Sequence, residues 1–451
     1  MRPNILFIID DQHRHDYLGC AGADWLNTPN IDRLAERGVR FTQCTTNSPV
    51  CAASRIGLAS GVQPSRIGAV DNSGILPLST PTYYQRLRDH SYRVACVGKL
   101  DLAKSDHYNG RDGDRPVAYS WGFTHPEECE GKMHAGSSPS PIGPYTRYLD
   151  EQGLLKAFHE DYETRKGKGY EVTAHDSVLP SEAFEDCYIG RRAAEWIEDV
   201  ADDFPWHMFV SFVGPHNPFD PPTEYADRYR NKEMPPSVPF NSTGKPDWVC
   251  KRSKAYDPDV VAVTRRQYCA ATEAVDDMVG RVLAAVEARG MANNTYVVFA
   301  SDHGEMLGDH GMYTKSCPQE AALRVPLIIA GPGIEGGRTS DALVELIDVN
   351  ATICDLAGLD PQPQIDAQSV RPILDGKSDS HRTETVSAFR KFRLIRTHEY
   401  KLVENYNDVT ELYDLKNDPD EQTNVADDHP EIVSRLAGRM KERFQEGMWN
   451  R

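Results

Sequence analysis

Short apolar runs that alternate with amphipathic helical segments constrain the fold of this chain more than any other feature. The runs are typical of buried strands, which we expect at residues 5–9, 92–97, 208–213, 295–300 and 325–330. Helical spacing predicts helices at residues 30–37, 180–200 and 261–289. Strands separated by helices favour an α/β fold with one large, mainly parallel central sheet and helices on both faces.

The C-terminal region has a different pattern. Residues 360–380 are rich in Pro, Asp, Gln and Ser and predict a connection, after which short β-like segments precede a helix. We expect the β-like segments at residues 392–396, 400–403 and 411–415, and the helix at 431–446. The predicted organisation is a catalytic domain at 1–360, a connection at 361–385 and a smaller antiparallel α+β subdomain at 386–451. Residues 101–170, rich in Gly, Pro, Ser and charge, predict loops around the mouth of a site.

Composition excludes several classes of protein. The net charge of -18 argues against a nucleic-acid partner, which requires a basic face. Without an apolar run of about 18 residues, we expect no transmembrane helix and no membrane partner. The apolar run at 5–9 is too short for a signal-peptide core, so we expect a cytoplasmic protein, or a periplasmic or secreted one if a leader was removed. Ten cysteines without C-x-x-C spacing predict reduced, mostly buried thiols, with Cys51 as the exception.

Polar clusters directly follow four of the predicted strands. They are Asp10-Asp11, Lys99, His216 and Asp302-His303. Because ligand sites in such sheets form at the carboxyl ends of the strands, we expect these side chains to meet at one edge. Adjacent carboxylates repel each other unless a cation lies between them. Taken alone, the aspartate pair is equally compatible with a helix N-cap or a solvated turn.

Cys51 precedes a helix-like run and therefore lies at a predicted helix N-terminus. The partial positive charge there lowers the pKa of a thiol and favours anions. Arg55, four residues on, reaches the same side one turn later. The segment from Cys51 to Arg55 by itself is also compatible with a buried structural cysteine.

The joint order of these segments resembles the type I sulfatases, members of the alkaline phosphatase superfamily, over nearly the whole chain. The resemblance rests on the opening aspartate pair, a cysteine modification motif, three short elements after strands and a C-terminal strand. These are Asp10-Asp11, Cys51 to Arg55, Gly98-Lys99, Pro215-His216, Ser301 to Gly304 and Glu411 to Leu415.

The resemblance implies that a formylglycine-generating maturation enzyme oxidises Cys51 to Cα-formylglycine. One hydroxyl of the hydrated aldehyde then attacks the sulfur of a sulfate ester, and the other re-forms the aldehyde by expelling sulfate. It also implies a divalent metal, calcium or magnesium, of which a flexible oxygen shell favours calcium. The metal ligands implied are Asp10, Asp11, Cys51, Asp302 and His303.

The same resemblance implies roles for several cationic residues. Arg55, Lys99 and Lys315 would stabilise the hydroxyls and the sulfate oxygens, and His216 or Lys315 would protonate the leaving alcohol. The implied catalytic set is Cys51, Arg55, Lys99, His216 and Lys315. The implied substrate contacts are Lys99, Asp101, Lys315 and Asn72.

The sequence departs from the family pattern at two positions. Ala53 stands where the modification motif more commonly has Pro, although the family tolerates Ala there. Asp101 stands where sulfatases usually have His. An aspartate that pointed inward would repel sulfate, whereas one that pointed away would orient Lys99.

We therefore expect an enzyme that hydrolyses the sulfate ester of a carbohydrate or a small alcohol. The alternative is a phosphonate monoester or phosphodiester hydrolase on the same scaffold, because residues 11–19 resemble the branch that contains choline sulfatases and phosphonate monoester hydrolases. A third hypothesis is a non-catalytic binding protein with an unmodified Cys51. A homo-oligomer is compatible with all three.

Overall fold

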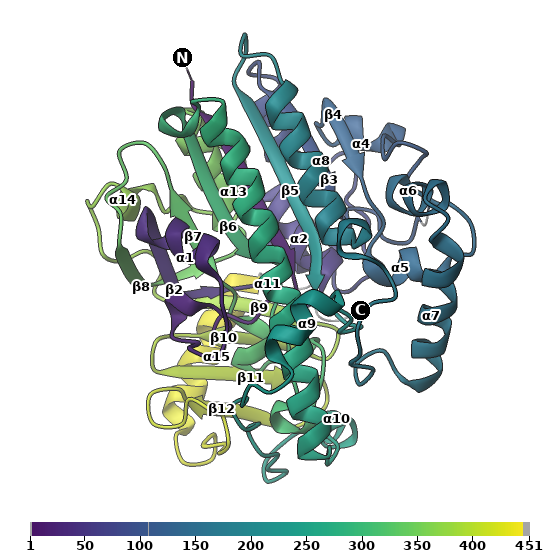
Figure 1. Ribbon diagram of the computed structural model, residues 1–451. Helices are drawn as coiled ribbons and strands as arrows, with labels where there is room; N and C mark the ends of the chain where they lie inside the picture. The colour runs from purple at the N-terminus through teal and green to yellow at the C-terminus, as the bar shows by residue number, and fades with distance from the viewer. Residues whose placement is uncertain (1, 107, 445–451) are drawn as a thin grey trace.

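An eight-stranded mixed sheet forms the centre of the computed structural model, which describes residues 2–106 and 108–444 (Figure 1). The strand order is β4-β3-β5-β1-β6-β7-β2-β8. The strands are β1 (Asn4–Asp11), β2 (Gly38–Thr45), β3 (Arg93–Gly98), β4 (His125–Glu128), β5 (Trp206–Pro215), β6 (Thr295–Ser301), β7 (Leu327–Ala330) and β8 (Arg338–Glu345). Only β7 runs antiparallel to its neighbours among these strands. The prediction of a mainly parallel sheet is confirmed.

The central strand β1 is buried on both faces, which explains its continuous apolar run. Ile5, Phe7 and Ile9 join the core on one face, and Leu6 and Ile8 join the core on the other. The first core includes residues of α2 (Cys51–Ser60), α3 (Tyr83–Arg88) and α13 (Asp348–Leu356). The second includes residues of α1 (Pro29–Glu36), α8 (Glu185–Asp199) and α11 (Pro258–Ala288). Helices therefore cover both faces, as predicted.

The segment from 101 to 170 is more regular than predicted, so the expectation of loops was wrong over much of its length. It contains α4 (Pro116–Ser120), β4, α5 (Lys132–Ser137), α6 (Pro144–Glu151) and α7 (Leu155–Lys168). Its glycines and prolines mark the ends of short elements, and Pro116 and Pro144 each begin a helix. Tyr145, Phe158 and Tyr162 bury their rings in the core beside α8, which stabilises helices too short to persist alone.

The C-terminal part is an antiparallel sheet of order β12-β11-β10-β9 covered by a helix, as predicted. Its elements are β9 (Thr385–Phe389), β10 (Phe392–Arg396), β11 (Tyr400–Asn405), β12 (Thr410–Asp414) and α15 (Pro430–Phe444). Strand β9 was not predicted, and residues 445–446 of the predicted helix lie outside the described residues. In Figure 1 this part lies at one end of the large sheet, where the Ala388 N–H donates to the Asn47 carbonyl.

The remaining elements are short. They are α9 (Thr223–Tyr229), α10 (Asp247–Arg252), α12 (Glu320–Leu323) and α14 (Arg371–Leu374), with 3-10 turns at Gly19–Ala21, Pro64–Ile67, Ser181–Ala183, Ala292–Asn294 and Asp309–Gly311. Within the described ranges, no helix is long and apolar enough to cross a bilayer. All ten cysteines are free thiols, and eight of them are buried, as the spacing predicted.

Candidate active site

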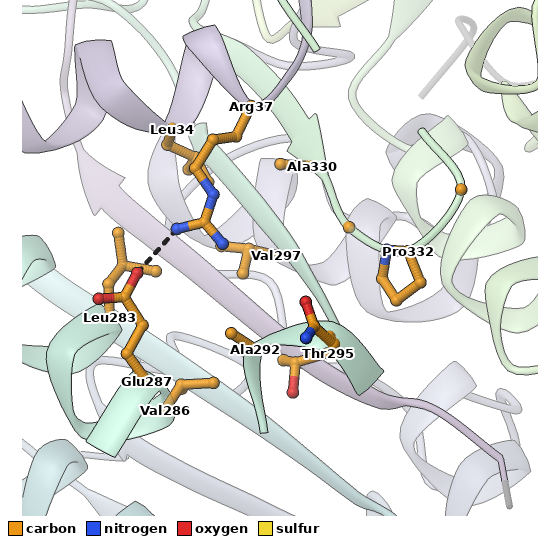
Figure 2. Close-up of a pocket in the computed structure, with 13 residues that line it drawn as sticks. Leu34, Arg37, Leu283, Val286, Glu287, Ala292, Thr295, Val297, Ala330 and Pro332 are labelled. Atoms are coloured by element: carbon orange, nitrogen blue, oxygen red, sulfur yellow. Dashed lines mark hydrogen bonds and ion pairs between the residues drawn. The ribbon is translucent and has the colours of Figure 1, made fainter. Parts of the chain in front are cut away.

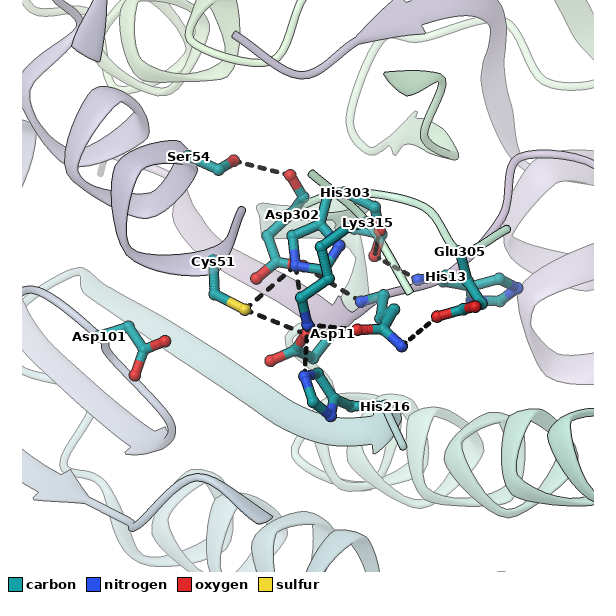
Figure 3. A network of polar contacts seen from close by, with 12 residues as sticks. Asp11, His13, Cys51, Ser54, Asp101, His216, Asp302, His303, Glu305 and Lys315 are labelled. Atoms are coloured by element: carbon teal, nitrogen blue, oxygen red, sulfur yellow. Dashed lines mark hydrogen bonds and ion pairs between the residues drawn. The ribbon is translucent and has the colours of Figure 1, made fainter. Parts of the chain in front are cut away.

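Side chains from three distant segments meet at the carboxyl edge of the large sheet (Figure 3). Asp11 ends β1, Cys51 begins α2, and Asp302 and His303 follow β6. All four are buried, and each offers one ligand atom such that the four atoms lie within 4.8 Å of one another. The predicted convergence of the polar segments is thus present in the structure.

Cys51 is the first residue of α2, after Val50 in an extended conformation. Its Sγ lies 3.1 Å from His303 Nε2 and 3.7 Å from Asp11 Oδ1. The backbone N–H groups of the first helical turn add a partial positive charge at this position. The side chain at position 51 is therefore directed at the cluster, where the nucleophile of a hydrolase would have to lie.

The thiol of Cys51 is in a strongly cationic environment. Burial alone would raise its pKa, but the charges of Lys104, Lys315 and Lys99 outweigh burial and hold the pKa of Cys51 well below its usual range. A site that stabilises a negative charge at this sulfur would also stabilise negative charge on an oxygen nucleophile or on a bound anion.

Arg55 binds several partners one helical turn beyond Cys51. Its Nε donates to Asp302 Oδ2 at 2.7 Å, and its Nη1 donates to the Lys99 carbonyl at 2.8 Å and to Ser211 Oγ at 2.7 Å. Its Nη2 is buried and has no hydrogen-bond partner among the described residues. The guanidinium is thus fixed by protein contacts, and its Nη2 lies 3.7 Å from Asp11 Oδ2.

The carboxylates of the cluster fit a divalent cation. Burial and the negative charge of Asp11 raise the pKa of Asp302, although the positive charge of Arg55 opposes this shift. A raised carboxyl pKa is expected where like charges lie close together and are not fully compensated. Asp10 lies outside the four-residue group: its Oδ2 contacts His13 Nδ1 at 2.5 Å. Its Oδ1 is buried without a hydrogen-bond partner among the described residues. The two carboxylates of the cluster supply the oxygen ligands that a hard cation prefers, and the Asp10 carboxylate lies next to them in sequence.

Asp101 faces lysines in the structure. Its Oδ2 accepts a hydrogen bond from Lys104 Nζ at 2.7 Å and forms an ion pair with Lys99 Nζ at 3.1 Å, and Lys99 also pairs with Asp11. The residue adopts a left-handed backbone with φ of 55°, which aspartate tolerates better than most side chains. Lys104 was not among the predicted site residues. Its only sequence signal is its position three residues after Asp101.

His216 and Lys315 contact each other. Lys315 Nζ lies 2.5 Å from His216 Nε2 and also contacts Gln12 Oε1. Burial and the Lys315 charge lower the pKa of His216 to about 4, so the imidazole is neutral near pH 7 and accepts from the ammonium. Gln12 was not predicted, although it directly follows the aspartate pair; its amide also donates to Asn217 Oδ1 at 3.1 Å.

A cavity of about 550 Å³ opens above the cluster. Asp11, Lys99, Lys104, His216 and Lys315 line its inner part. Its outer wall comes from α5 and the end of α7, and includes Lys132, Met133, His134, Lys166, Tyr170 and Glu171. Asn72 also lines the cavity, and its Oδ1 accepts from the Ala52 N–H at 3.1 Å, so it binds the N-terminus of α2.

A second hollow of about 260 Å³ lies at the opposite end of β6, next to Thr295 (Figure 2). Its charged residues, Arg37 and Glu287, pair with each other at 2.8 Å. It lacks the convergent polar groups that mark a reactive site. The cavity at the carboxyl edge, in contrast, combines a buried polar cluster with several lysines.

The fold and the site define an enzyme of the alkaline phosphatase superfamily. The profile of the Sulfatase family matches residues 3–359, so the chain belongs to the sulfatase family, as predicted, and is an enzyme of the sulfuric ester hydrolase class. The profile described as "N-sulphoglucosamine sulphohydrolase, C-terminal" matches residues 308–447.

Named relatives and solved structures agree with this assignment. The chain is 29% identical to a choline-sulfatase of Rhizobium meliloti, covering 94% of this chain and 83% of the relative. It is 26% identical to an arylsulfatase of Clostridium perfringens, and the match covers 94% of this chain and 90% of the relative. The phosphonate monoester hydrolase of Agrobacterium radiobacter has a similar fold, with a TM-score of 0.82 and 23% identity. The match covers 98% of this chain and 95% of that structure. A protein solved with its substrate D-glucosamine-2-N,6-O-disulfate has a TM-score of 0.77 at 20% identity, with full coverage of both chains.

Proposed function

We propose that this protein hydrolyses sulfate monoesters of a carbohydrate or a small alcohol, with Cys51 converted to formylglycine as the nucleophile. One observation carries the proposal: residue 51 lies at a helix N-terminus inside a buried cluster of Asp11, Asp302 and His303, below a cavity lined by Lys99 and Lys315. A hydrated formylglycine supplies one hydroxyl to attack sulfur and a second to expel sulfate afterwards.

We propose that Asp10, Asp11, Asp302 and His303 hold a divalent cation together with the modified residue 51. Calcium suits this oxygen-rich set better than magnesium, which demands a stricter octahedral shell. When bound, the cation would lower the pKa of a hydroxyl and neutralise sulfate charge. The unpartnered Asp10 Oδ1 supports the inclusion of Asp10.

The cationic residues have separable roles in this proposal. Arg55 and Lys99 face the nucleophile from the protein side and stabilise negative charge there. Lys315 donates a proton to the leaving alcohol, because the neutral His216 already accepts from its ammonium and holds it in place.

The size of the cavity supports a small organic leaving group. A volume of about 550 Å³ lies in the range of small-molecule sites, which hold ligands of sugar size. Tyr170 and His134 on the outer wall provide a ring face and a polar group for such a ligand. The relatives named choline-sulfatase and N-acetylglucosamine-6-O-sulfatase support both substrate types.

The test begins with the mass of the proteolytic peptide that contains Cys51, from protein co-produced with a formylglycine-generating enzyme. We expect the aldehyde, together with hydrolysis of an aryl sulfate that the Cys51→Ala variant lacks. Phenylphosphonate monoester and phosphodiester substrates are assayed in parallel. An unmodified thiol, or a modified protein that hydrolyses none of the sulfate esters, would overturn the proposal.

A phosphonate monoester or phosphodiester hydrolase is the second candidate. Asp101 in place of the usual His favours it, and so does the fold of the Agrobacterium radiobacter phosphonate monoester hydrolase. The relative from Trinickia caryophylli that is named a multifunctional alkaline phosphatase superfamily protein is 26% identical to this chain. Under this candidate, the phosphonate ester is turned over faster than the aryl sulfate in the same parallel assay.

A further inference from the structure

Lys104 is a cavity lysine that lies outside every motif of the family resemblance. It is in the segment after β3, three residues beyond Asp101, and its side chain is 18% exposed. It lines the same cavity as Asp11, Lys99 and Lys315.

Asp101 sets the spacing between two of these lysines. Its Oδ2 accepts a hydrogen bond from Lys104 Nζ at 2.7 Å and forms an ion pair with Lys99 Nζ at 3.1 Å. The two ammonium nitrogens are therefore separated by at most the sum of these distances, about 5.8 Å. Lys99 and Lys104 line the same cavity, so within this limit their ammonium groups can donate to different oxygens of one bound tetrahedral anion.

We propose that Lys104 binds the oxygens of the transferred anionic group together with Lys99 and Lys315, and that Asp101 is its positioning residue. The inference rests on the proposed function, because it assigns the anion to the sulfate end of the substrate. An isolated aspartate at position 101 would repel sulfate. Bound to two ammonium groups, Asp101 instead brings a cation to the place where a histidine is expected from the family pattern.

The competing interpretation is that Lys104 only neutralises the buried charge of Asp101. Removal of the ammonium weakens binding of inorganic sulfate, the reaction product, under both interpretations, but for different reasons. If Lys104 binds the anion, sulfate affinity stays low in the Lys104→Met/Asp101→Asn double variant. If it only neutralises Asp101, the loss comes from the uncompensated carboxylate, and the double variant recovers it.

The first experiment compares Lys104→Met with Lys104→Arg in the formylglycine-containing enzyme. A charge-assisted hydrogen bond predicts an increase of about tenfold in the inhibition constant of sulfate for Lys104→Met, and a similar fall in kcat/KM for an aryl sulfate. Lys104→Arg keeps the charge and recovers most of both losses. Lys156→Met, at an 87% exposed lysine of α7, is the matched control and leaves both constants unchanged.

The second experiment tests the positioning role of Asp101. Asp101→Asn removes the anchor of Lys104 and also removes a negative charge. We therefore expect kcat to fall about tenfold while KM does not rise, and we expect a smaller effect of the substitution in the Lys104→Met background. An equal effect of Asp101→Asn in both backgrounds would show that Asp101 does not act through Lys104.

A binding measurement separates this inference from the proposed function. Sulfate binding to the unconverted Cys51 protein is measured by calorimetry at constant ionic strength and does not require turnover. Sulfate binding that is weakened in Lys104→Met and stays weak in the Lys104→Met/Asp101→Asn double variant supports the inference even if the modified enzyme cleaves no sulfate ester. Unchanged sulfate binding by Lys104→Met, in an enzyme that does cleave sulfate esters, overturns the inference and leaves the proposed function intact.

Discussion

Replacement of Arg55 by methionine should destabilise the metal-free protein by about 3–5 kcal/mol. Both Arg55 and its partner Asp302 are almost fully buried, and their charges are joined by a 2.7 Å hydrogen bond. Removing one partner of a buried ion pair leaves the other charge uncompensated, which costs roughly 3–5 kcal/mol in comparable cases. Asp11, 3.7 Å from the same guanidinium, loses part of its compensation as well.

Two further hydrogen bonds place the expected loss in the upper half of this range. The Lys99 carbonyl and Ser211 Oγ both accept from Arg55 Nη1, and methionine can replace neither bond. A buried acceptor left without a donor costs about 1–3 kcal/mol. Relaxation of Asp302 to its protonated form limits the total, because the pKa of this carboxyl is already raised.

The free energy of unfolding is measured by urea denaturation at pH 7 in the presence of a chelator. Arg37→Met is the matched control, since Arg37 pairs with Glu287 at 2.8 Å with both side chains about half exposed. Exposed pairs contribute only about 0–1 kcal/mol. A loss for Arg55→Met as small as that of the control would refute the view that Arg55 compensates the buried carboxylates.

Two further predictions concern the cation and the response to pH. Calcium at about 100 times its dissociation constant should stabilise the wild type against unfolding by about 2.7 kcal/mol. The Asp11→Asn variant should lose most of this stabilisation, which is measured by thermal unfolding at increasing calcium concentration. Equal stabilisation of the variant and the wild type would exclude Asp11 as a ligand. Burial lowers the pKa of His207 to about 3. Between pH 6.5 and 3 the unfolded chain therefore binds a proton that the folded protein does not, and stability falls as the pH falls, by up to about 1.4 kcal/mol per pH unit from this residue. His207→Asn, which can retain the bond to the Ile5 carbonyl, should reduce that slope in denaturation curves recorded across this range; an unchanged slope would contradict the assignment.

Much of the fold and the site was predictable from local sequence. The run Ile5–Ile9 predicts a fully buried strand because both of its faces are apolar, and the structure places it in the middle of the sheet. Asp11 and Asp302 were predictable as neighbours because each follows such a strand, and parallel strands present their carboxyl ends at one edge. Cys51 was predictable at a helix start from the run that follows it.

Other features depended on contacts between distant segments. The antiparallel direction of β7 is decided by its pairing with β6 and β2, whereas an apolar run of four residues reads the same in either direction. Helices α6 and α7 depend on the core that buries Tyr145, Phe158 and Tyr162, because helices of this length are marginal without tertiary packing.

The residues of the site also divide into those whose position follows from local sequence and those whose position depends on distant contacts. The aspartates, the cysteine and Lys99 are held by regular elements, and their side-chain directions follow from strand ends and a helix start. Lys104 and Gln12 lie in irregular segments, where backbone direction changes from residue to residue. Their roles emerge only from the partners that bind them, Asp101 for Lys104 and Lys315 for Gln12. The sequence alone thus determined the family and the position of Cys51, the nucleophile proposed above, while tertiary structure decided which charges surround Cys51, because long flexible side chains take their direction from distant partners.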